Sequence, residues 1–283
     1  MNSLKDTFRL SNGVEIPCVG FGTWQAKNGT EARKSVEWAL AAGYRHIDTA
    51  AGYRNEESVG AAVRNSGIAR EELFITSKLQ NEEHGYDKTM KAFEHTMKKL
   101  AMEYLDLYLI HWPNPIAFRN QWQQANAGSW KAFEELYRAG RIRAIGVSNF
   151  HPRHIDELLK TAEVVPMVNQ IRLCPGDTQD DVVDYCRAKG ILLEAYSPLG
   201  TGSIFNVPEM QAFAKKYNKT VAQVCVRWSL QMGFLPLPKS VTEARIRENA
   251  DVFGFSLSDE DVKAIAGMKG VCGYSANPDT TTW

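Results

Sequence analysis

YRHIDTAAGYRNEESVGAAVRNSG (residues 44–67) contains the structural unit that recurs along the chain. It begins with a short apolar run, YRHID, and continues through a polar loop into ESVGAAVRNSG, which has the apolar spacing of an amphipathic helix and ends in glycine. Short apolar runs are typical of buried strands, and glycine is favoured just after a helix because it adopts positive φ without steric cost. The stretch therefore predicts a strand followed by a helix.

Apolar runs of this kind occur eight times. They are CVGFG (18–22), YRHID (44–48), LFITS (73–77), LDLYLI (105–110), IRAIGV (142–147), VPMVNQ (165–170), ILLEAY (191–196) and FLPLP (234–238). Segments of helical periodicity separate them, and four of these segments end in glycine, at Gly43, Gly67, Gly140 and Gly190. Alternating helices and strands that are apolar on both faces indicate an α/β fold with a parallel sheet. Eight such units in about 250 residues predict a closed (β/α)8 TIM barrel.

Two further elements are expected outside the eight units. FRLSNGVEI (8–16) places the turn dipeptide Asn12-Gly13 between two alternating runs, which predicts an N-terminal β-hairpin that plugs the barrel floor. Ser258, with Asp261 three residues later, has the pattern of an N-cap and predicts an extra C-terminal helix. No linker or internal repeat divides the chain, so we expect residues 1–283 to form a single barrel domain.

Charge and cysteine content exclude several classes of protein. The 33 basic residues balance the 33 acidic residues, so no overall positive field exists to attract nucleic acid or an anionic membrane surface. The five cysteines form no CxxC pair, which argues against a disulfide framework and a zinc site. With no apolar signal region and no long apolar window, the sequence predicts a cytoplasmic protein without a membrane segment. Nothing in it requires assembly or a metal, so we expect a monomer.

Ionisable residues stand at the ends of three successive strands. Asp48 ends the second apolar run, Lys78 and His111 come directly after the third and fourth, and Tyr53 lies in the loop after Asp48. Active sites of TIM barrels lie at these strand ends. An alternative is that each residue is a cap or a solvated loop residue, and a buried Asp and Lys would pair under either interpretation. Three ionisable residues at equivalent places favour a catalytic cluster.

The cluster suits proton transfer to a carbonyl oxygen. A phenol with an ordinary pKa of about 10 is an effective acid near neutrality only if nearby positive charge stabilises the phenolate, and Lys78 can supply that charge. Asp48 would hold the lysine, and a neutral His111 would orient the carbonyl. A proton donor without a nucleophile suggests hydride transfer, and hence a nicotinamide cofactor.

The phosphates of such a cofactor need a binding site other than a Rossmann loop. No GxGxxG motif occurs, because position 25, where a third glycine would follow Gly20 and Gly22, is Gln25. KSVTEARIREN (239–249) follows the eighth run, where barrels often bind phosphate at a helix N-terminus. Lys239, Ser240 and Arg245 would suit a phosphate monoester, although a solvated helix start has the same composition.

Three stretches now identify a resemblance. GYRHIDTAAGYRNEESVG (43–60), GRIRAIGVSNF (140–150) and LPKSVTEARIREN (237–249) resemble the signatures of the NADPH-dependent aldo-keto reductases, and the similarity covers essentially the whole chain. The resemblance implies that the catalytic tetrad is Asp48, Tyr53, Lys78 and His111, the residues that the strand ends selected. It also implies a set of cofactor-binding residues, which comprises Gly22, Thr23, Trp24, Ser148, Asn149, Gln170, Tyr196, Ser197, Leu199, Gly200, Lys239, Ser240, Val241, Thr242, Arg245, Glu248 and Asn249. Lys239, Ser240, Thr242 and Arg245 would bind the adenosine 2′-phosphate, which predicts NADPH rather than NADH.

The resemblance implies a small carbonyl substrate. We expect Trp24, Tyr53, His111 and Trp112 to contact it, and Phe118, Trp122 and Trp283 are further candidates for an aromatic mouth. Compact microbial relatives reduce small aldehydes, 2-oxoaldehydes such as methylglyoxal, and keto-sugars. Gln80 is a departure, because the family often has Trp near this position.

Several alternatives to catalysis remain open. The chain could be an NADPH-binding redox sensor without significant turnover, or an inert structural protein, although the latter requires loss of a site that is present here. His151 and His154, at the start of the helix after the fifth run, are interpreted as surface residues, since two histidines three apart without a third ligand rarely bind metal. Cys174 receives no role.

Overall fold

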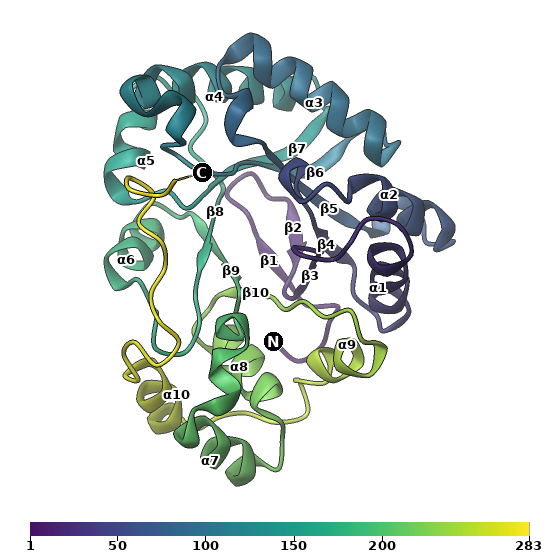
Figure 1. Cartoon of the computed structure of the whole chain (residues 1–283), viewed down its shortest axis with the longest axis vertical. Helices are drawn as coiled ribbons and strands as arrows, with labels where there is room; N and C mark the ends of the chain where they lie inside the picture. Colours follow the sequence, from purple (N-terminus) through teal and green to yellow (C-terminus); the bar gives the residue numbers. More distant parts are fainter. Residues whose placement is uncertain (283) are drawn as a thin grey trace.

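Eight parallel strands form a ring at the centre of the molecule (Figure 1). The computed structural model describes residues 1–282. The strands of the ring, each hydrogen-bonded to the next in sequence order, are β3 (Gly20–Gly22), β4 (His46–Asp48), β5 (Phe74–Leu79), β6 (Leu105–Ile110), β7 (Ile142–Ser148), β8 (Val168–Arg172), β9 (Leu192–Tyr196) and β10 (Leu235–Leu237). The ring closes where the Gly22 N–H donates to the carbonyl oxygen of Pro238 at 3.1 Å. The predicted (β/α)8 barrel is confirmed.

Helices surround the ring. The α-helices are α1 (Thr30–Ala41), α2 (Glu56–Asn65), α3 (Tyr86–Leu100), α4 (Trp122–Arg138), α5 (Pro152–Leu159), α6 (Asp180–Ala188), α7 (Pro208–Tyr217), α8 (Val221–Gln231), α9 (Glu243–Ala250) and α10 (Asp259–Ala266). All four glycines expected to end helices have positive φ, between 69° and 102°. At the extra C-terminal helix, the Ser258 hydroxyl accepts from the Asp261 N–H at 3.2 Å, as predicted. Helix α7 was not predicted.

The N-terminal hairpin lies inside one end of the ring, as Figure 1 shows. It consists of β1 (Thr7–Arg9) and β2 (Glu15–Pro17), which pair antiparallel. Ile16 is fully buried, and the Asn12 side chain donates to the carbonyl oxygen of Arg143, at the start of β7, at 2.9 Å. Since the start of β7 belongs to the N-terminal end of the barrel, the hairpin closes the floor, and the opposite end remains available for a site.

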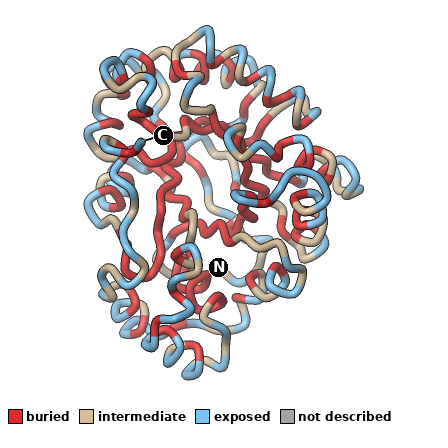
Figure 2. The backbone as a smooth tube through the Cα atoms, viewed as in Figure 1, coloured by how far each residue is buried: buried red, intermediate tan, exposed pale blue. Residues whose placement is uncertain are grey.

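Burial follows the barrel plan (Figure 2). The strands are almost entirely buried, whereas the surrounding helices alternate between buried inner and exposed outer positions. Parallel strands covered by helices on one side and by the barrel interior on the other must be apolar on both faces, which explains the continuous apolar runs. Of the helices in residues 1–282, none combines the length and apolar character needed to cross a membrane.

The segment after α10 crosses the face of the molecule instead of returning to the barrel wall. In Figure 1 it runs, in yellow, past α6 towards α5. The Asp279 carboxylate accepts from Asn114 at 3.0 Å and lies 2.9 Å from the His154 ring nitrogen. His154 is fully buried, so its interpretation as a surface residue was wrong. The tail supplied a carboxylate partner that sequence spacing did not reveal.

Aromatic residues near this tail do not form the expected mouth. Trp122 packs edge-on against His154, with ring centroids 5.2 Å apart. Phe118 stacks on His84 at 5.7 Å. Both side chains consolidate loops outside the cavity described below. The candidate Trp283 lies outside the described residues.

Candidate active site

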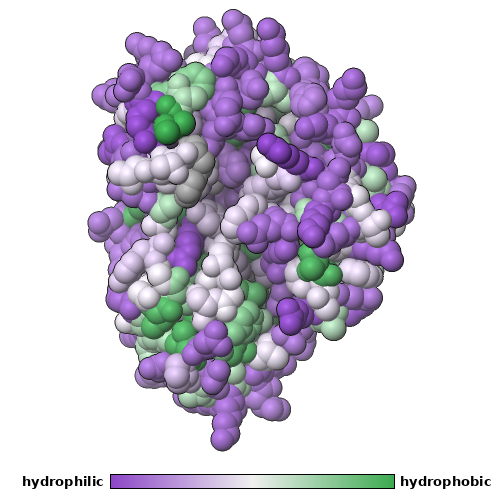
Figure 3. Space-filling model, viewed as in Figure 1, coloured by the Kyte–Doolittle hydropathy of each residue, from purple (hydrophilic) through white to green (hydrophobic). Residues whose placement is uncertain are grey.

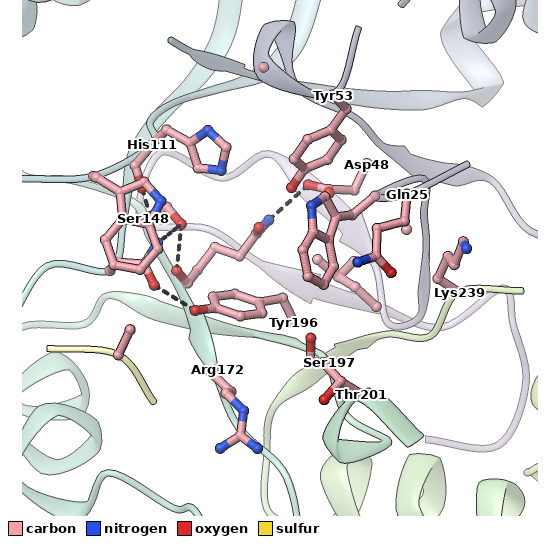
Figure 4. Close-up of a pocket in the computed structure, with 18 of the residues that line it drawn as sticks. Gln25, Asp48, Tyr53, His111, Ser148, Arg172, Tyr196, Ser197, Thr201 and Lys239 are labelled. Atoms are coloured by element: carbon pink, nitrogen blue, oxygen red, sulfur yellow. Dashed lines mark hydrogen bonds between the residues drawn. The ribbon is translucent and has the colours of Figure 1, made fainter. Parts of the chain in front are cut away.

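A cavity of about 800 Å³ opens at the C-terminal ends of the strands. Figure 4 shows that side chains from many strands point into it. The predicted residues that line it are Gly22, Trp24, Asp48, Tyr53, His111, Trp112, Ser148, Asn149, Gln170, Tyr196, Ser197, Leu199 and Lys239. The barrel thus brings together catalytic, substrate-binding and cofactor-binding candidates that are far apart in sequence.

Lys78 connects the catalytic candidates from beneath the cavity. Its ammonium lies 2.7 and 2.8 Å from the two carboxylate oxygens of Asp48, and it also donates to the Thr49 carbonyl oxygen at 2.9 Å. The Tyr53 hydroxyl is 3.2 Å away. Burial alone would lower the pKa of Lys78, but Asp48 and Tyr53 raise it above its ordinary value. Lys78 therefore remains a cation beside the phenol.

The proton of Tyr53 is firmly held in this structure. Burial raises the pKa of Tyr53, and the positive charge of Lys78 only partly opposes that effect. A sequence argument from Lys78 alone would suggest a phenol pKa below its usual value. In the structure the charge of Lys78 does not achieve this, because burial outweighs it. The phenol is fully protonated at neutral pH, and Lys78 stabilises the phenolate that a proton transfer would leave.

His111 stands opposite Tyr53. Their ring centroids are 5.7 Å apart and the rings meet edge to face. Burial and the nearby Lys78 lower the pKa of His111 to about 3, so its imidazole is neutral at any physiological pH. A neutral imidazole beside a protonated phenol gives two donors that can converge on one oxygen atom.

A hydrogen-bonded row connects the ends of β7, β8 and β9. Asn149 donates to the His111 carbonyl oxygen at 3.0 Å and accepts from the Tyr196 hydroxyl at 2.8 Å. The Ser148 hydroxyl donates to the Gln170 carbonyl oxygen at 2.8 Å. These bonds, drawn in Figure 4, hold the side chains of the wall opposite Tyr53 in place. Asn149 takes a positive φ of 62°, a conformation that asparagine tolerates better than most residues.

Gln170 and Glu194 extend this network below the cavity. The Gln170 amide donates to Asp48 and to Glu194, both at 2.8 Å, so only its oxygen remains free to bind a carboxamide. Glu194 was not singled out in the sequence, because it sits in the middle of an apolar run. It is fully buried, and burial together with the Asp48 charge raises the pKa of Glu194 to about 8. Glu194 is therefore a neutral acid at pH 7.

The pKa of Glu194 makes stability depend on pH. The native carboxyl keeps its proton up to about pH 8, whereas in the unfolded chain it loses the proton near its ordinary value of 4.5. Its contribution to stability is complete below that value and is lost as pH rises towards 8. As pH rises from about 4.5 to 8, the unfolding free energy of the wild type should fall. We expect this fall to be smaller in Glu194→Gln, by about 2–4 kcal/mol. Urea unfolding of both proteins at several pH values measures this difference, and parallel curves would contradict it.

The proposed phosphate-binding residues continue from one edge of the cavity. Lys239 lines it, and Ser240 accepts from the Thr242 N–H at 3.0 Å just before α9. Arg245 is exposed on α9. Within residues 1–282 neither Lys239 nor Arg245 forms an ion pair. Lys239 at the edge of the cavity and Arg245 on the helix that follows thus provide positive charge for an anionic group.

Other predicted cofactor residues lie outside the cavity. The Thr23 hydroxyl donates to the Asp48 backbone carbonyl oxygen at 2.9 Å, which supports the floor from behind. Gly200 is buried in the 3₁₀ segment η5 (Gly200–Asn206). Glu248 accepts from Thr220, and Asn249 is buried on α9. The predicted cofactor residues that do not line the cavity are Thr23, Gly200, Ser240, Val241, Thr242, Arg245, Glu248 and Asn249.

Several polar loop residues line the cavity, and among them the sequence analysis drew attention only to Gln80. These residues are Gln25, Arg54, Gln80, Asn81 and Glu82. The Gln80 amide donates to Glu82 at 2.8 Å. These residues come from irregular loops, where periodicity gives no signal. Gln80 therefore places an amide in the lining of the cavity.

Apolar residues near the opposite rim come from η5 and the tail. Phe205 and Ala276 line the cavity, and Phe205 is exposed. Figure 3 shows hydrophobic side chains gathered on this part of the face, whereas the rest of the rim is mostly hydrophilic. The lining of the cavity therefore combines polar and apolar residues.

Comparisons with known proteins agree with this geometry. Residues 18–269 match the model of the Aldo/keto reductase family. Glyoxal reductase of Bacillus subtilis is 50% identical over 277 residues, with 98% of each chain covered. The 9,11-endoperoxide prostaglandin H2 reductase of Trypanosoma cruzi is 42% identical, covering 99% of this chain and 97% of its own length.

A solved structure is also similar. The aldo-keto reductase of Bombyx mori in complex with NADP superimposes with a TM-score of 0.86 at 35% identity, covering 96% of this chain and 94% of the other. Together with the family match and the 50% identity to a reductase, these similarities show that the chain belongs to the aldo/keto reductase family.

Proposed function

We propose that the protein uses NADPH to reduce small aldehydes, 2-oxoaldehydes and keto-sugars to alcohols, with Tyr53 as the proton donor. The observation that carries the proposal is the buried Asp48–Lys78–Tyr53 chain, which ends at a protonated phenol facing neutral His111 inside the cavity. Similarity to glyoxal reductase supports a small dicarbonyl substrate, and similarity to a structure that contains NADP supports the cofactor.

The residues of this chain perform the proton transfer as follows. Tyr53 and His111 donate hydrogen bonds to the substrate carbonyl oxygen and polarise it. Bound NADPH supplies the hydride that the carbonyl carbon accepts. Tyr53 then gives its proton to the oxygen, and Lys78, held by Asp48, stabilises the phenolate. Water restores the proton of Tyr53 once the alcohol leaves.

The chemistry of the cavity lining supports a nicotinamide cofactor. Tyr196, Ser197, Leu199, Gly22 and Trp24 all line the cavity and would contact it. Ser148, Asn149 and the oxygen of Gln170 would hold the carboxamide, and Lys239 with Arg245 would hold the 2′-phosphate. Thr23, Gly200, Ser240, Val241, Thr242, Glu248 and Asn249 complete the proposed cofactor set as supporting or adenosine-side residues.

Arg245→Leu tests the phosphate site. We expect the KM for NADPH to rise about tenfold, since charge-assisted hydrogen bonds to phosphate are lost, while kcat and the KM for NADH change little. Arg247→Leu is the matched control, because Arg247 lies on the same helix but pairs with Glu243 at 2.8 Å. Steady-state kinetics with both cofactors provide the measurement. An equal effect of the two substitutions, or a loss confined to kcat, would contradict the assignment.

The mixed polar and apolar lining of the cavity suits a short carbonyl compound with further oxygen atoms. Trp24 and Trp112 would contact its carbon chain, and the polar residues Gln80, Asn81 and Glu82 would bind hydroxyl or second carbonyl groups. A substrate panel tests this proposal. We expect kcat/KM for methylglyoxal and keto-sugars to exceed that for unsubstituted alkanals of equal length, and the reverse order would overturn the substrate class.

The whole chain is proposed to act as a single barrel domain and as a monomer in the cytoplasm. Support comes from the balanced charge and from five cysteines that are free thiols, four of them buried. Light scattering coupled to size-exclusion chromatography should give a mass near 31.7 kDa. A mass of twice this value would contradict the monomer.

A further inference from the structure

Two cysteines that the proposed mechanism does not use lie together beside the cavity. Cys174 follows β8 and is fully buried, whereas Cys272 belongs to the tail after α10 and is partly exposed. The two thiols are close enough for each to shift the pKa of the other. The sequence gives no indication of this pairing, because the two cysteines are 98 positions apart.

The backbones that carry the two thiols are fastened to each other. The Arg172 guanidinium donates to the carbonyl oxygens of Cys272 at 2.7 Å and Gly273 at 3.2 Å, and it pairs with Asp177. The Gly270 N–H donates to the Gly176 carbonyl oxygen at 2.9 Å. The tail is therefore held against the loop after β8, which keeps Cys174 and Cys272 on adjoining segments.

The two thiols differ in reactivity. The neighbouring Cys174 thiol, the Ser203 hydroxyl and the nearby Arg172 charge hold the pKa of Cys272 below its usual range. The same contact and burial raise the pKa of Cys174. An accessible thiolate next to a protonated thiol is the arrangement of an attacking cysteine and its resolving partner.

We propose that Cys272 and Cys174 are a site of reversible disulfide formation with hydroperoxides. The Cys272 thiolate attacks the O–O bond, so that an S–O bond forms, the O–O bond breaks, and the leaving oxygen takes up a proton as water or an alcohol. Cys174 then attacks the Cys272 sulfenic acid, forming the S–S bond, and the departing oxygen leaves as water with the Cys174 proton. The two sulfurs together lose two electrons, and the peroxide gains them.

This site adjoins the segment that closes one side of the cavity. The Cys272 side chain packs closely against Gly200 in η5. A Cβ atom added at Gly200 would lie 2.8 Å from both Cβ and Sγ of Cys272. Thr201, Gly202 and Phe205 of the same segment line the cavity. Formation of the disulfide turns the Cys272 sulfur towards Cys174, so its packing against Gly200 in η5 changes. We expect the KM for NADPH to rise by about threefold to tenfold on oxidation, an effect that rests on the proposed function.

Peptide mapping tests the disulfide itself. The full-length protein is treated with hydrogen peroxide, free thiols are alkylated, and the digest is analysed by mass spectrometry. We expect a Cys174–Cys272 cross-link that dithiothreitol reverses, and Cys186→Ser should keep it, because Cys186 is buried beside Asn169. Cys174→Ser should leave Cys272 to accumulate as sulfenic or sulfinic acid. A wild-type Cys272 that reaches sulfinic acid while Cys174 remains alkylatable, or a link to Cys225, would overturn the proposal.

The effect on the cofactor is measured separately. NADPH binding, followed by fluorescence before and after oxidation, should weaken in the wild type and recover with dithiothreitol. An unchanged affinity in the cross-linked protein would overturn the coupling to η5. If the protein failed to reduce any carbonyl compound, the proposed function would fall while the peptide map still decided the disulfide.

Discussion

Tyr53→Phe should lower kcat by about 10²- to 10⁴-fold and leave NADPH affinity within about twofold of the wild type. The substitution removes one oxygen, the atom that lies 3.2 Å from the Lys78 ammonium, and keeps the ring that packs edge-on to His111. Without the Tyr53 hydroxyl, the substrate carbonyl oxygen has no proton donor. Steady-state turnover and NADPH binding by fluorescence measure the two quantities.

Tyr196→Phe is a suitable comparison for this experiment. It removes a hydroxyl from the same cavity, but that hydroxyl bonds to Asn149 at 2.8 Å and does not contact Lys78. We expect a much smaller loss of kcat from this variant. Retention of more than about a tenth of the activity by Tyr53→Phe would exclude Tyr53 as the proton donor.

Lys78→Met should be the most destabilising single substitution in the site. Lys78 and Asp48 are almost completely inaccessible to solvent, and loss of the cation leaves the carboxylate without its ion pair. Removal of one partner from a buried pair costs about 3–5 kcal/mol. We expect a loss of this size in the unfolding free energy, measured by urea denaturation, and a fall in kcat of at least about 10²-fold.

A double substitution separates the two effects of Lys78. In Asp48→Asn/Lys78→Met neither charge of the buried pair remains, and the amide oxygen introduced at position 48 can still accept from Gln170, which donates to Asp48 at 2.8 Å in the wild type. We expect at least half of the lost stability to return while activity stays low. If activity returned together with stability, Lys78 would serve only the fold.

The fold could be predicted from the sequence because each strand is apolar on both faces and the helix-ending glycines mark the period of the units. The floor hairpin followed from Asn12-Gly13, and the C-terminal helix from the cap at Ser258. Helix α7 was missed because its residues follow an irregular connection and bury few side chains. The local sequence pattern predicts the elements that face the core, and the prediction fails for elements that make few contacts with the core.

The centre of the candidate site was also predictable, since strand ends converge in a barrel. Asp48, Lys78 and His111 end successive strands, and the structure brings them within reach of Tyr53. The pKa of Tyr53 could not be predicted from the sequence, because desolvation depends on the complete three-dimensional surroundings. Glu194 was hidden in an apolar run, and the contacts of His154 and Cys174 depend on a tail more than 90 residues away in sequence.

The most direct test of the account is the oxidation of NADPH by the wild-type protein in the presence of methylglyoxal, followed through the nicotinamide absorbance. The account predicts saturable oxidation that requires the carbonyl compound and is abolished by Tyr53→Phe. If the protein binds NADPH but oxidises none with methylglyoxal or with any member of the substrate panel, the reductase account is contradicted and a cofactor-binding redox sensor takes its place.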